Sequence, residues 1–229
     1  MLRFGLFDLD DTLYAAQSGL WTAIGNRIDQ YLVEKLGLPA DGVREQRRVW
    51  FDEYGTTLNG LRAERQVDPA DYLAFVHDIP LEDYLQPSPA LDAMLARLPV
   101  EKVIFTNADA PHALRVLNRL GVGHHFQTVI DIQALGFVNK PEPRAYQYVL
   151  DRLGATGPEC FFVDDAPRNL QPARLLGMYT VLISPAPVTA RLARVDAVID
   201  NILGLEAALQ LAGLPSRSAL PSAPEGGQP

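Results

Sequence analysis

The sequence has very little cysteine and no dense block of basic residues. A single cysteine among 229 residues excludes an internal disulfide, so we expect a cytoplasmic protein in a reducing environment. We expect this residue, Cys160, to be a small buried apolar side chain at the start of a strand. The formal net charge of −8 argues against a nucleic-acid polymer as partner. An anionic substrate would then need a metal ion and a few well-placed cations.

The sequence also lacks an apolar run long enough to cross a bilayer, and it begins without the basic region of a signal peptide. We therefore expect no membrane association. Hydrophobic residues make up 48% of the chain, enough for a core in one large or two modest domains. These features leave the oligomeric state open between monomer and homodimer. Residues 215–229 are rich in Pro, Ser and Gly, and we expect a disordered tail there.

Short apolar runs alternate along the chain with stretches of helical spacing. Most of the apolar runs have no polar face, which is typical of strands covered on both sides. The expected strands are Leu2–Leu9, Val103–Thr106, Thr128–Ile132, Phe161–Val163, Thr180–Ile183 and Ala197–Ile199. The expected helices between them are Pro89–Leu98, Pro111–Leu120, Pro143–Leu153 and Arg168–Leu176. This alternation predicts an α/β fold with a parallel sheet.

The segment from about residue 18 to residue 85 contains no expected strand. Its helical spacing predicts three helices, Ser18–Leu36, Val43–Tyr54 and Pro69–Ile79. We interpret residues 15–87 as a helical cap inserted after the first strand, and residues 1–14 and 88–214 as the core. A cap inserted directly after a catalytic strand would lie over the site, where it can exclude water.

Asp8 and Asp10 lie where the first expected strand ends, with one residue between them. Ligand sites in open parallel sheets lie beyond the carboxyl ends of the strands. Paired carboxylates there can hold a divalent cation, and one can act as a nucleophile while the other transfers a proton. By themselves these acids could also form only a turn with a helix cap, because Asp favours both roles.

Polar residues also follow three later strands. Thr106 and Asn107 lie at the end of the second, Lys140 lies in the loop after the third, and Asp164 and Asp165 come directly after the fourth. A threonine hydroxyl and backbone N–H groups suit phosphate oxygens, Lys140 adds a point charge, and Mg²⁺ prefers oxygen ligands. Taken singly, Lys140 would be a solvated surface lysine and Thr106 a helix cap. Together they favour phosphoryl transfer, which needs positioning and charge stabilisation.

These motifs, in this order, resemble the haloacid dehalogenase superfamily of phosphohydrolases over about residues 1–200. The resemblance implies a doubly wound, Rossmann-like core with the first strand central. It implies that Asp8 is the nucleophile and that Asp10 first protonates the leaving oxygen and then deprotonates water. Dehalogenating members lack the second acid. The implied Mg²⁺ ligands are the Asp8 carboxylate, the Asp10 backbone carbonyl and Asp165, with Asp164 binding directly or through water. The implied phosphate-binding residues are Asp8, Thr106, Asn107 and Lys140.

A narrower resemblance is to the pyrimidine 5′-nucleotidase branch of that superfamily. It is carried by the first motif, by residues 54–61 and by residues 105–109 with His112. It implies a small-molecule phosphate ester as substrate, with a pyrimidine nucleoside 5′-monophosphate preferred. The alternatives are a phosphatase of another small ester, such as a sugar phosphate, and a phosphomutase on the same fold.

Several further residues have two interpretations. Asn169 could orient the metal-binding acids or cap the helix that follows them. The four histidines are expected at the surface or hydrogen-bonded in the core, and His112 is the one nearest a motif. Aromatic residues of the cap, Trp21, Trp50, Phe51 and Tyr54, could stack on a base or pack in the helical core. We expect a loop at Thr56–Asn59 that reads the substrate.

Overall fold

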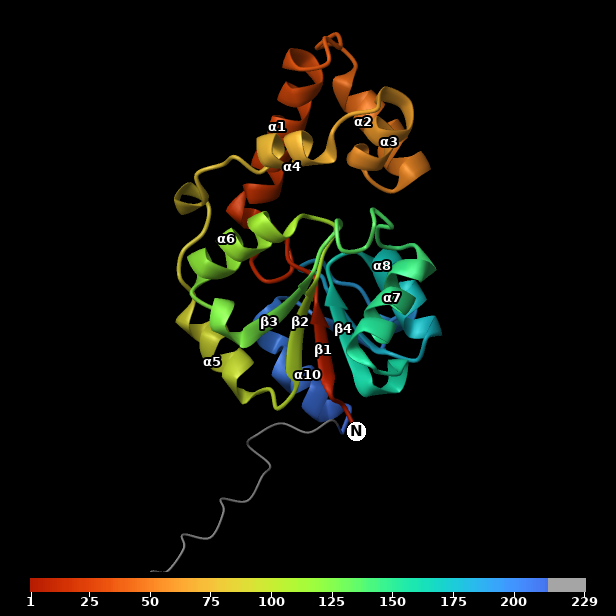
Figure 1. The fold of residues 1–229 in the computed structure, drawn as a ribbon. Coiled ribbons are helices and arrows are strands. Elements are labelled where there is room, and N and C mark those ends of the chain that lie inside the picture. Colours follow the sequence, from red (N-terminus) through yellow and green to blue (C-terminus); the bar gives the residue numbers. More distant parts are fainter. Residues whose placement is uncertain (214–229) are drawn as a thin grey trace, which may run out of the picture.

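The computed structural model describes residues 1–213, which form a layered α/β fold with further helices at one end (Figure 1). The sheet has six parallel strands in the order β3-β2-β1-β4-β5-β6. The strands are β1 (Phe4–Phe7), β2 (Glu101–Phe105), β3 (Phe126–Ile130), β4 (Cys160–Asp164), β5 (Tyr179–Ile183) and β6 (Ala197–Ile199). The predicted parallel α/β fold is confirmed, and β1 lies inside the sheet between β2 and β4.

Helices cover both faces of the sheet, because successive side chains of a strand point to opposite sides. Phe7 and Ile104 face one layer of helices, and Leu6 and Phe105 face the other. The first layer holds α5 (Pro89–Arg97), α6 (Ala110–Leu120) and α10 (Leu205–Leu211), and the second holds α7 (Pro143–Leu153) and α8 (Pro167–Leu175). Burial on both faces explains why the strands carry no polar side.

Four helices of the core, α5 to α8, begin and end within one residue of the predicted bounds, whereas α10 was not predicted. Pro89 and Pro143 each occupy the first helical position, where the missing N–H group has no intrahelical partner to lose. Ser88 caps α5 by accepting a hydrogen bond from the backbone N–H of Leu91. Gly121 ends α6 with φ 78° and Gly154 ends α7 with φ 57°, in the left-handed region that favours glycine.

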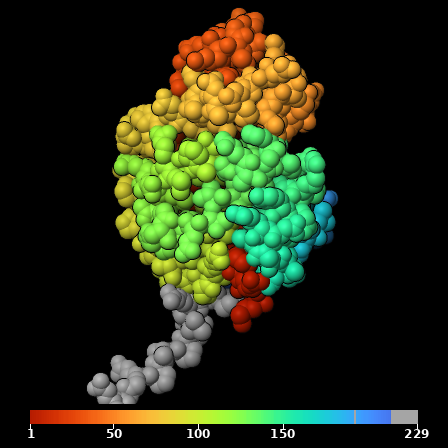
Figure 2. Space-filling model, in the orientation of Figure 1, coloured from red at the N-terminus to blue at the C-terminus, as the bar shows by residue number. Residues whose placement is uncertain are grey.

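A group of helices lies over the carboxyl ends of the strands, at the opposite end of the molecule from the N-terminus (Figures 1 and 2). These cap helices are α1 (Leu20–Glu34), α2 (Val43–Tyr54), α3 (Thr57–Arg65) and α4 (Pro69–Val76). The sequence predicts α1, α2 and α4 to within a few residues but does not predict α3. The prediction of a loop at Thr56–Asn59 is wrong. Thr56 accepts a hydrogen bond from the Asn59 N–H and caps α3, so residues 57–59 are helical.

Short elements make the remaining connections. They are α9 (Ala190–Ala193) and the 3₁₀ turns η1 (Ala16–Ser18), η2 (Leu81–Asp83), η3 (Gly123–His125), η4 (Gly157–Glu159) and η5 (Ile202–Gly204). Cys160 is buried at the start of β4, as predicted. Within residues 1–213, no helix combines the length and apolar character that crossing a membrane requires. Residue 214 of the predicted core and the predicted tail, residues 215–229, lie outside the described residues.

Candidate active site

The order of the strands reverses beside β1, and the predicted acids meet at this point. The chain runs from β1 through β2 to β3 and then returns to β4 on the other side of β1. Asp8 directly follows β1, where its N–H donates to the Val163 carbonyl at 3.0 Å, and Asp164 is the last residue of β4. Open parallel sheets bind ligands at such a switch point. The fold therefore brings the first and fourth motifs together.

Lys140 joins these two acids. Its Nζ donates a hydrogen bond to Oδ1 of Asp8 at 2.6 Å and another to Oδ2 of Asp164 at 2.8 Å. Only 1% of the Lys140 surface is exposed, so the surface interpretation of this lysine is wrong. The ring centroids of Phe105 and Phe162 also lie 5.1 and 5.2 Å from Nζ. An ammonium group in this place must be paired, because an unpaired buried charge is costly.

Two asparagines fix the backbone at Lys140. Asn107 accepts a hydrogen bond from the Lys140 N–H at 2.8 Å and donates one to its carbonyl at 3.1 Å. Asn139 donates to the same carbonyl at 2.7 Å, and the Lys140–Pro141 peptide bond is cis. The Asn107 side chain thus acts on the loop that presents Lys140, and its contact with phosphate stays a prediction.

Burial and charge act in opposite directions on the Lys140 cluster. Burial raises the pKa of Asp8, and although the Lys140 ammonium opposes this shift, the nearby charge of Asp164 adds to it. Burial would lower the pKa of Lys140, but the carboxylates of Asp164 and Asp8 raise it on balance. Lys140 therefore keeps its positive charge between the two acids.

Three carboxylates form a group suited to a cation. Asp8, Asp164 and Asp165 each offer an oxygen within 4.8 Å of the others. Asn169 donates to both oxygens of Asp164 at 3.0 Å, and it lies inside α8, so its contacts match the orienting role. The exposed Asp165 has lost part of its hydration and lies beside Asp164, and these effects raise its pKa to about 7. This excess of negative oxygen ligands fits a divalent cation.

Asp10 lies beside this group and is held through one oxygen. Its Oδ1 accepts a hydrogen bond from the Tyr14 hydroxyl at 2.6 Å and lies 2.9 Å from Nε2 of His112. Burial would raise the pKa of Asp10, but the contacts with His112 and Tyr14 lower it on balance. Neither partner of Asp10 was assigned a role from the sequence.

Two threonines complete the site. Thr106 follows β2, and its N–H donates to the Ile130 carbonyl at 3.1 Å. Its hydroxyl oxygen accepts a hydrogen bond from the Ala108 N–H at 3.0 Å, so the hydroxyl hydrogen can be donated to a ligand. Thr12 donates to Oδ2 of Asp8 at 3.2 Å and helps to fix that carboxylate.

A cavity of about 310 Å³ lies between the acids and the cap helices, and we name it the catalytic cavity. Residues of the core that line it include Asp8, Asp10, Thr106, Asn107, Lys140, Asp165 and Asn169. Of the aromatic residues considered for stacking, Trp21 and Phe51 line this cavity, whereas Trp50 is fully buried in the cap. The volume is near the lower limit of small-molecule sites, roughly 300–1,000 Å³.

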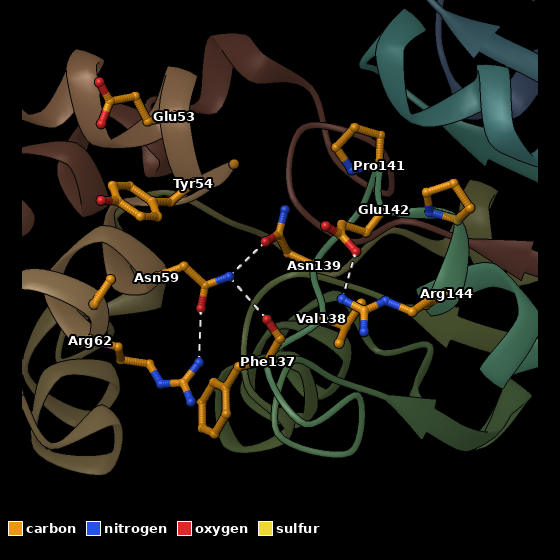
Figure 3. Close-up of a pocket in the computed structure, with 13 residues that line it drawn as sticks. Glu53, Tyr54, Asn59, Arg62, Phe137, Val138, Asn139, Pro141, Glu142 and Arg144 are labelled. Carbon is orange, nitrogen blue, oxygen red and sulfur yellow. Dashed lines mark hydrogen bonds and ion pairs between the residues drawn. The ribbon is translucent and has the colours of Figure 1, made fainter.

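A larger hollow of about 790 Å³ lies where α2 and α3 meet the loop before α7 (Figure 3). Here Asn59 donates to the Phe137 carbonyl at 2.9 Å and to Oδ1 of Asn139 at 2.7 Å, and Arg62 lies 3.9 Å over the Phe137 ring. Its lining includes Asn139 and Pro141 but not Asp8 or the other clustered acids. The clustered acids therefore border the smaller cavity and not this hollow, which we interpret as part of the contact between cap and core.

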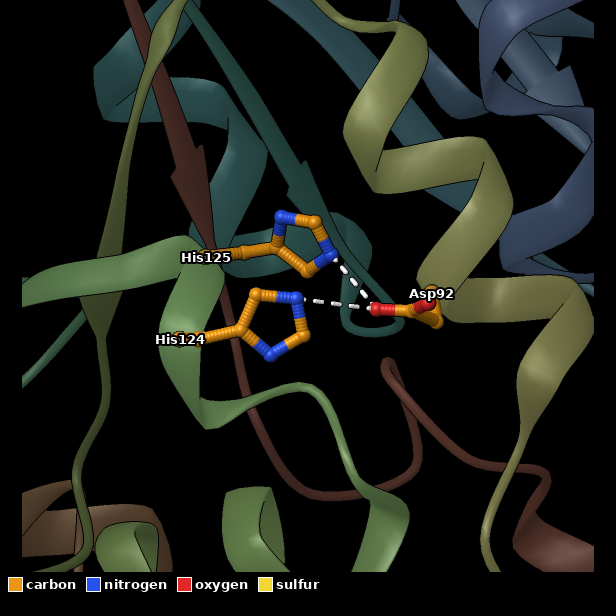
Figure 4. A group of neighbouring side chains, drawn as sticks. All are labelled: Asp92, His124 and His125. Carbon is orange, nitrogen blue, oxygen red and sulfur yellow. Dashed lines mark hydrogen bonds and ion pairs between the residues drawn. The ribbon is translucent and has the colours of Figure 1, made fainter.

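A second group of possible metal ligands lies where β3 begins, at the opposite edge of the sheet. Nε2 of His124 and Nε2 of His125 approach Oδ1 of Asp92 at 3.1 and 2.8 Å (Figure 4). A carboxylate oxygen can accept two N–H groups, so hydrogen bonding accounts for this arrangement. We assign no function to it.

The structure brings all the predicted site residues to one edge of the sheet, but their chemical roles stay predictions. They are Asp8, Asp10, Thr106, Asn107, Lys140, Asp164 and Asp165. Thr12 and Tyr14 were not predicted, although each lies four residues after the acid that it contacts. Residues 8–14 form an irregular turn, so the four-residue spacing alone was not enough to predict these two contacts. His112 reaches Asp10 across 102 positions, which no local pattern reveals.

This combination of fold and site agrees with comparisons to known proteins. Residues 6–177 match the haloacid dehalogenase-like hydrolase family, and the chain belongs to that family. It is a hydrolase with phosphatases among its relatives. The predicted superfamily is thereby confirmed, whereas the pyrimidine 5′-nucleotidase branch stays a prediction.

Individual relatives show the extent of the similarity. Phosphate metabolism protein 8 of Saccharomyces cerevisiae is 27% identical over 194 residues, which cover 77% of this chain and 60% of the yeast protein. The phosphoglycolate phosphatase of Pectobacterium atrosepticum is 30% identical over 188 residues, which cover 76% of this chain and 77% of that protein. The crystal structure of a HAD phosphatase from Thermococcus onnurineus superposes with a TM-score of 0.60 at 21% identity, covering 93% of this chain and 98% of that one.

Proposed function

We propose that this protein is a Mg²⁺-dependent phosphatase that hydrolyses small phosphate monoesters through a phosphoryl group carried on Asp8. The observation that carries the proposal is the contact of Lys140 with both Asp8 and Asp164 at the switch point of the sheet. Phosphatases among the relatives support the reaction type. A domain without catalytic function would gain little from this cluster, because burying charges offsets much of what their pairing contributes.

In this proposal the chain's own residues carry two chemical steps. An oxygen of Asp8 attacks phosphorus while the bond to the leaving oxygen breaks, and Asp10 gives its proton to that oxygen. Water then attacks the phosphorus, Asp10 takes the proton, and the bond to Asp8 breaks to release phosphate. Thr106 and Lys140 bind the phosphoryl oxygens throughout. The negative charge of the bound phosphate favours a proton on Asp10 in the first step.

The metal would be held by Asp8, Asp165 and the backbone carbonyl of Asp10. The fit rests on the excess of carboxylates over buried ammonium groups in the cluster. Both oxygens of Asp164 already accept hydrogen bonds from the protein, so we propose that Asp164 acts through water or by orienting its neighbours. When bound, Mg²⁺ would supply positive charge to the phosphoryl oxygens.

The preferred substrate in this proposal is a pyrimidine nucleoside 5′-monophosphate. Trp21 and Phe51 line the catalytic cavity with 50% and 39% of their surfaces exposed, which suits stacking on a planar base. The small cavity and the phosphoglycolate phosphatase relative also support another small ester, such as a sugar phosphate, as the alternative. A phosphomutase would pass the phosphoryl group to a second hydroxyl instead of water.

The organisation of the chain belongs to the same proposal. We propose that residues 1–14 and 88–214 form the catalytic core and that residues 15–87 form the cap that closes over the ester. A cytoplasmic location and a monomer or homodimer stay predictions.

A screen of phosphate monoesters tests this function. Purified protein is assayed for inorganic phosphate release from pyrimidine and purine nucleotides, phosphoglycolate and sugar phosphates, with Mg²⁺ and with EDTA. We expect release only with Mg²⁺, fastest from a pyrimidine nucleotide, and none with Asp8→Asn. Release that EDTA leaves unchanged would contradict the metal, and inactivity on every ester would reject the phosphatase. A rearranged ester in place of free phosphate would identify a mutase.

A further inference from the structure

Asp10 is anchored on one side only. Within residues 1–213, its side-chain hydrogen bonds all involve Oδ1, with the Tyr14 hydroxyl at 2.6 Å and Nε2 of His112 at 2.9 Å. The carboxylate keeps 12% of its side-chain surface exposed and lines the catalytic cavity. The other oxygen, Oδ2, is therefore available to a ligand while Oδ1 fixes the orientation of the group.

The His112 ring is buried, and its contact with Asp10 uses only one of its two nitrogens. It is 1% exposed, and among the described residues its Nδ1 has no hydrogen-bond partner. Its backbone is fixed at the start of α6, where Asp109 caps the helix by accepting a hydrogen bond from the His112 N–H at 3.3 Å. An ionised carboxylate can only accept hydrogen bonds, so Nε2 carries the proton that faces Asp10.

A second histidine holds the His112 ring in place. His77, directly after α4, stacks on it with 4.2 Å between ring centroids and 17° between ring planes. Nδ1 of His77 lies 2.8 Å from Oδ1 of Asp109. Arg115 of α6 donates to the carbonyls of His77 at 2.7 Å and Ile79 at 2.6 Å. The segment that leads from the cap back to the core is thus tied to the helix that carries His112.

We propose that His112 is a positioning residue for proton transfer by Asp10. By holding Oδ1, it directs Oδ2 toward the leaving oxygen of the ester, and the stacked His77 ring prevents the imidazole from turning away. This inference rests on the proposed function of Asp10 as acid and base. It adds to the site a residue that lies outside the four motifs.

The leaving group of the substrate separates positioning from a merely structural role. An alkyl ester oxygen departs with difficulty unless it receives a proton, whereas an aryl oxygen such as that of p-nitrophenyl phosphate departs without one. The ratio kcat/KM includes transfer of the phosphoryl group to Asp8, which is the step in which the leaving oxygen is protonated. A misplaced acid therefore lowers kcat/KM for alkyl phosphates far more than for aryl phosphates.

The test compares His112→Asn with His112→Gln. The amide nitrogen of Gln extends about as far from the backbone as Nε2, whereas that of Asn does not reach Asp10. We expect His112→Asn to lower kcat/KM for an alkyl phosphate by about tenfold to a hundredfold, within the roughly 10²–10⁴-fold that general acid catalysis supplies. For p-nitrophenyl phosphate kcat/KM should fall by less than about threefold, and His112→Gln should recover most of the loss.

Three comparisons make the result decisive. His125→Asn removes a similar contact, 2.8 Å from Asp92 at the far edge of the sheet, and should leave both rates unchanged. Tyr14→Phe removes the other contact to Oδ1 of Asp10 but keeps the aromatic ring. If His112→Asn fails to fold, this variant takes its place in the comparison of the two esters. If the wild-type protein hydrolyses both esters and Asp8→Asn abolishes this activity, the proposed function is supported whatever the His112 variants show. Given that turnover, equal losses for the two esters, or no loss, would overturn the positioning role.

Discussion

Lys140 links the chemistry of the site to the stability of the protein. Its ammonium group pairs with Asp8 and Asp164, and all three side chains are buried. We predict that Lys140→Met abolishes phosphate release and lowers the free energy of unfolding by about 3–5 kcal/mol, because both carboxylates lose their cation. Denaturant unfolding at neutral pH measures the loss. Lys35→Met, at an exposed position, should change stability by less than about 0.5 kcal/mol.

The double variant Asp8→Asn/Lys140→Met checks the physical reason for that loss. Removing one carboxylate together with the lysine leaves less unpaired charge, so the double variant should be more stable than the sum of the single effects predicts. Strict additivity would mean that the Lys140–Asp8 contact of 2.6 Å contributes nothing to stability.

At the scale of residues, the motif positions could be predicted but several of their partners could not. Asp8 and Asp164 each stand at the end of an apolar run, and parallel strands bring such ends to one edge. No comparable local pattern predicts where His77 and His112 lie. His77 meets His112 only because α4 leads back toward α6, and this placement depends on the tertiary packing of the cap. Both rings are buried beside a carboxylate, which is the second of the two placements expected for the histidines.

At the scale of elements, the start of α3 connects the cap to the loop that carries Lys140. Asn59 donates to Asn139, and Asn139 donates to the Lys140 carbonyl. We predict that Asn59→Ala raises KM by up to about tenfold with a smaller change in kcat, because the cap loses hydrogen bonds of about 0.5–1.5 kcal/mol each to the core. Steady-state kinetics with the best ester of the screen measures this effect.

Asn201→Ala is the matched control for that variant. Asn201 caps η5 by accepting from the Leu203 N–H, and it does not line the catalytic cavity. We expect a small loss of stability and an unchanged KM. If Asn59→Ala also left KM unchanged, the link between cap and core would have no part in substrate binding.

The failure to predict α3 has an identifiable cause. Gly60 lies inside α3, and glycine is among the poorest helix formers, so the local pattern favours a loop. The structure needs glycine there because a Cβ atom would collide with the Trp50 ring. Gly55 is required in the same way, with φ 79° and the Asn139 side chain where its Cβ would lie. Packing between α2 and α3, which local propensity does not include, therefore decides this part of the cap.

The ends of the strands are also decided partly by interactions that local propensity does not include. The third strand was expected at Thr128–Ile132 but spans Phe126–Ile130. Ile132 is buried like a strand residue, so its apolar character is misleading. Asp131 turns the chain before it, since its side chain accepts hydrogen bonds from the N–H groups of Ala110 and Ala134, each at 2.8 Å. The alternation of apolar runs was nevertheless sufficient to predict the parallel sheet.

At the scale of the whole molecule, a net charge of −8 and a crowded acidic site both favour cation binding. We predict that Mg²⁺ raises Tm, because a ligand that binds only the folded protein stabilises it. Partial loss of hydration and the adjacent Asp164 raise the pKa of Asp165 to about 7, so a proton competes with the metal below that value. The rise in Tm should therefore be larger at about pH 8 than at about pH 5.

Thermal unfolding with and without Mg²⁺ measures this effect independently of activity. Asp165→Asn should remove most of the rise in Tm, because it removes a proposed ligand. Asp92→Asn, which alters the distant group of Asp92, His124 and His125, should keep the rise. An equal rise in Asp165→Asn and the wild-type protein would place the metal elsewhere.

The central claim is that Asp8 carries the phosphoryl group between the two chemical steps. Acid quenching during turnover of a phosphate monoester with Mg²⁺, followed by mass spectrometry of the peptide that contains Asp8, tests it most directly. The account predicts a phosphoryl adduct on Asp8 in the wild-type protein and none in Asp8→Asn. Turnover of the ester with an adduct on another residue, or with full activity in Asp8→Asn, would contradict it.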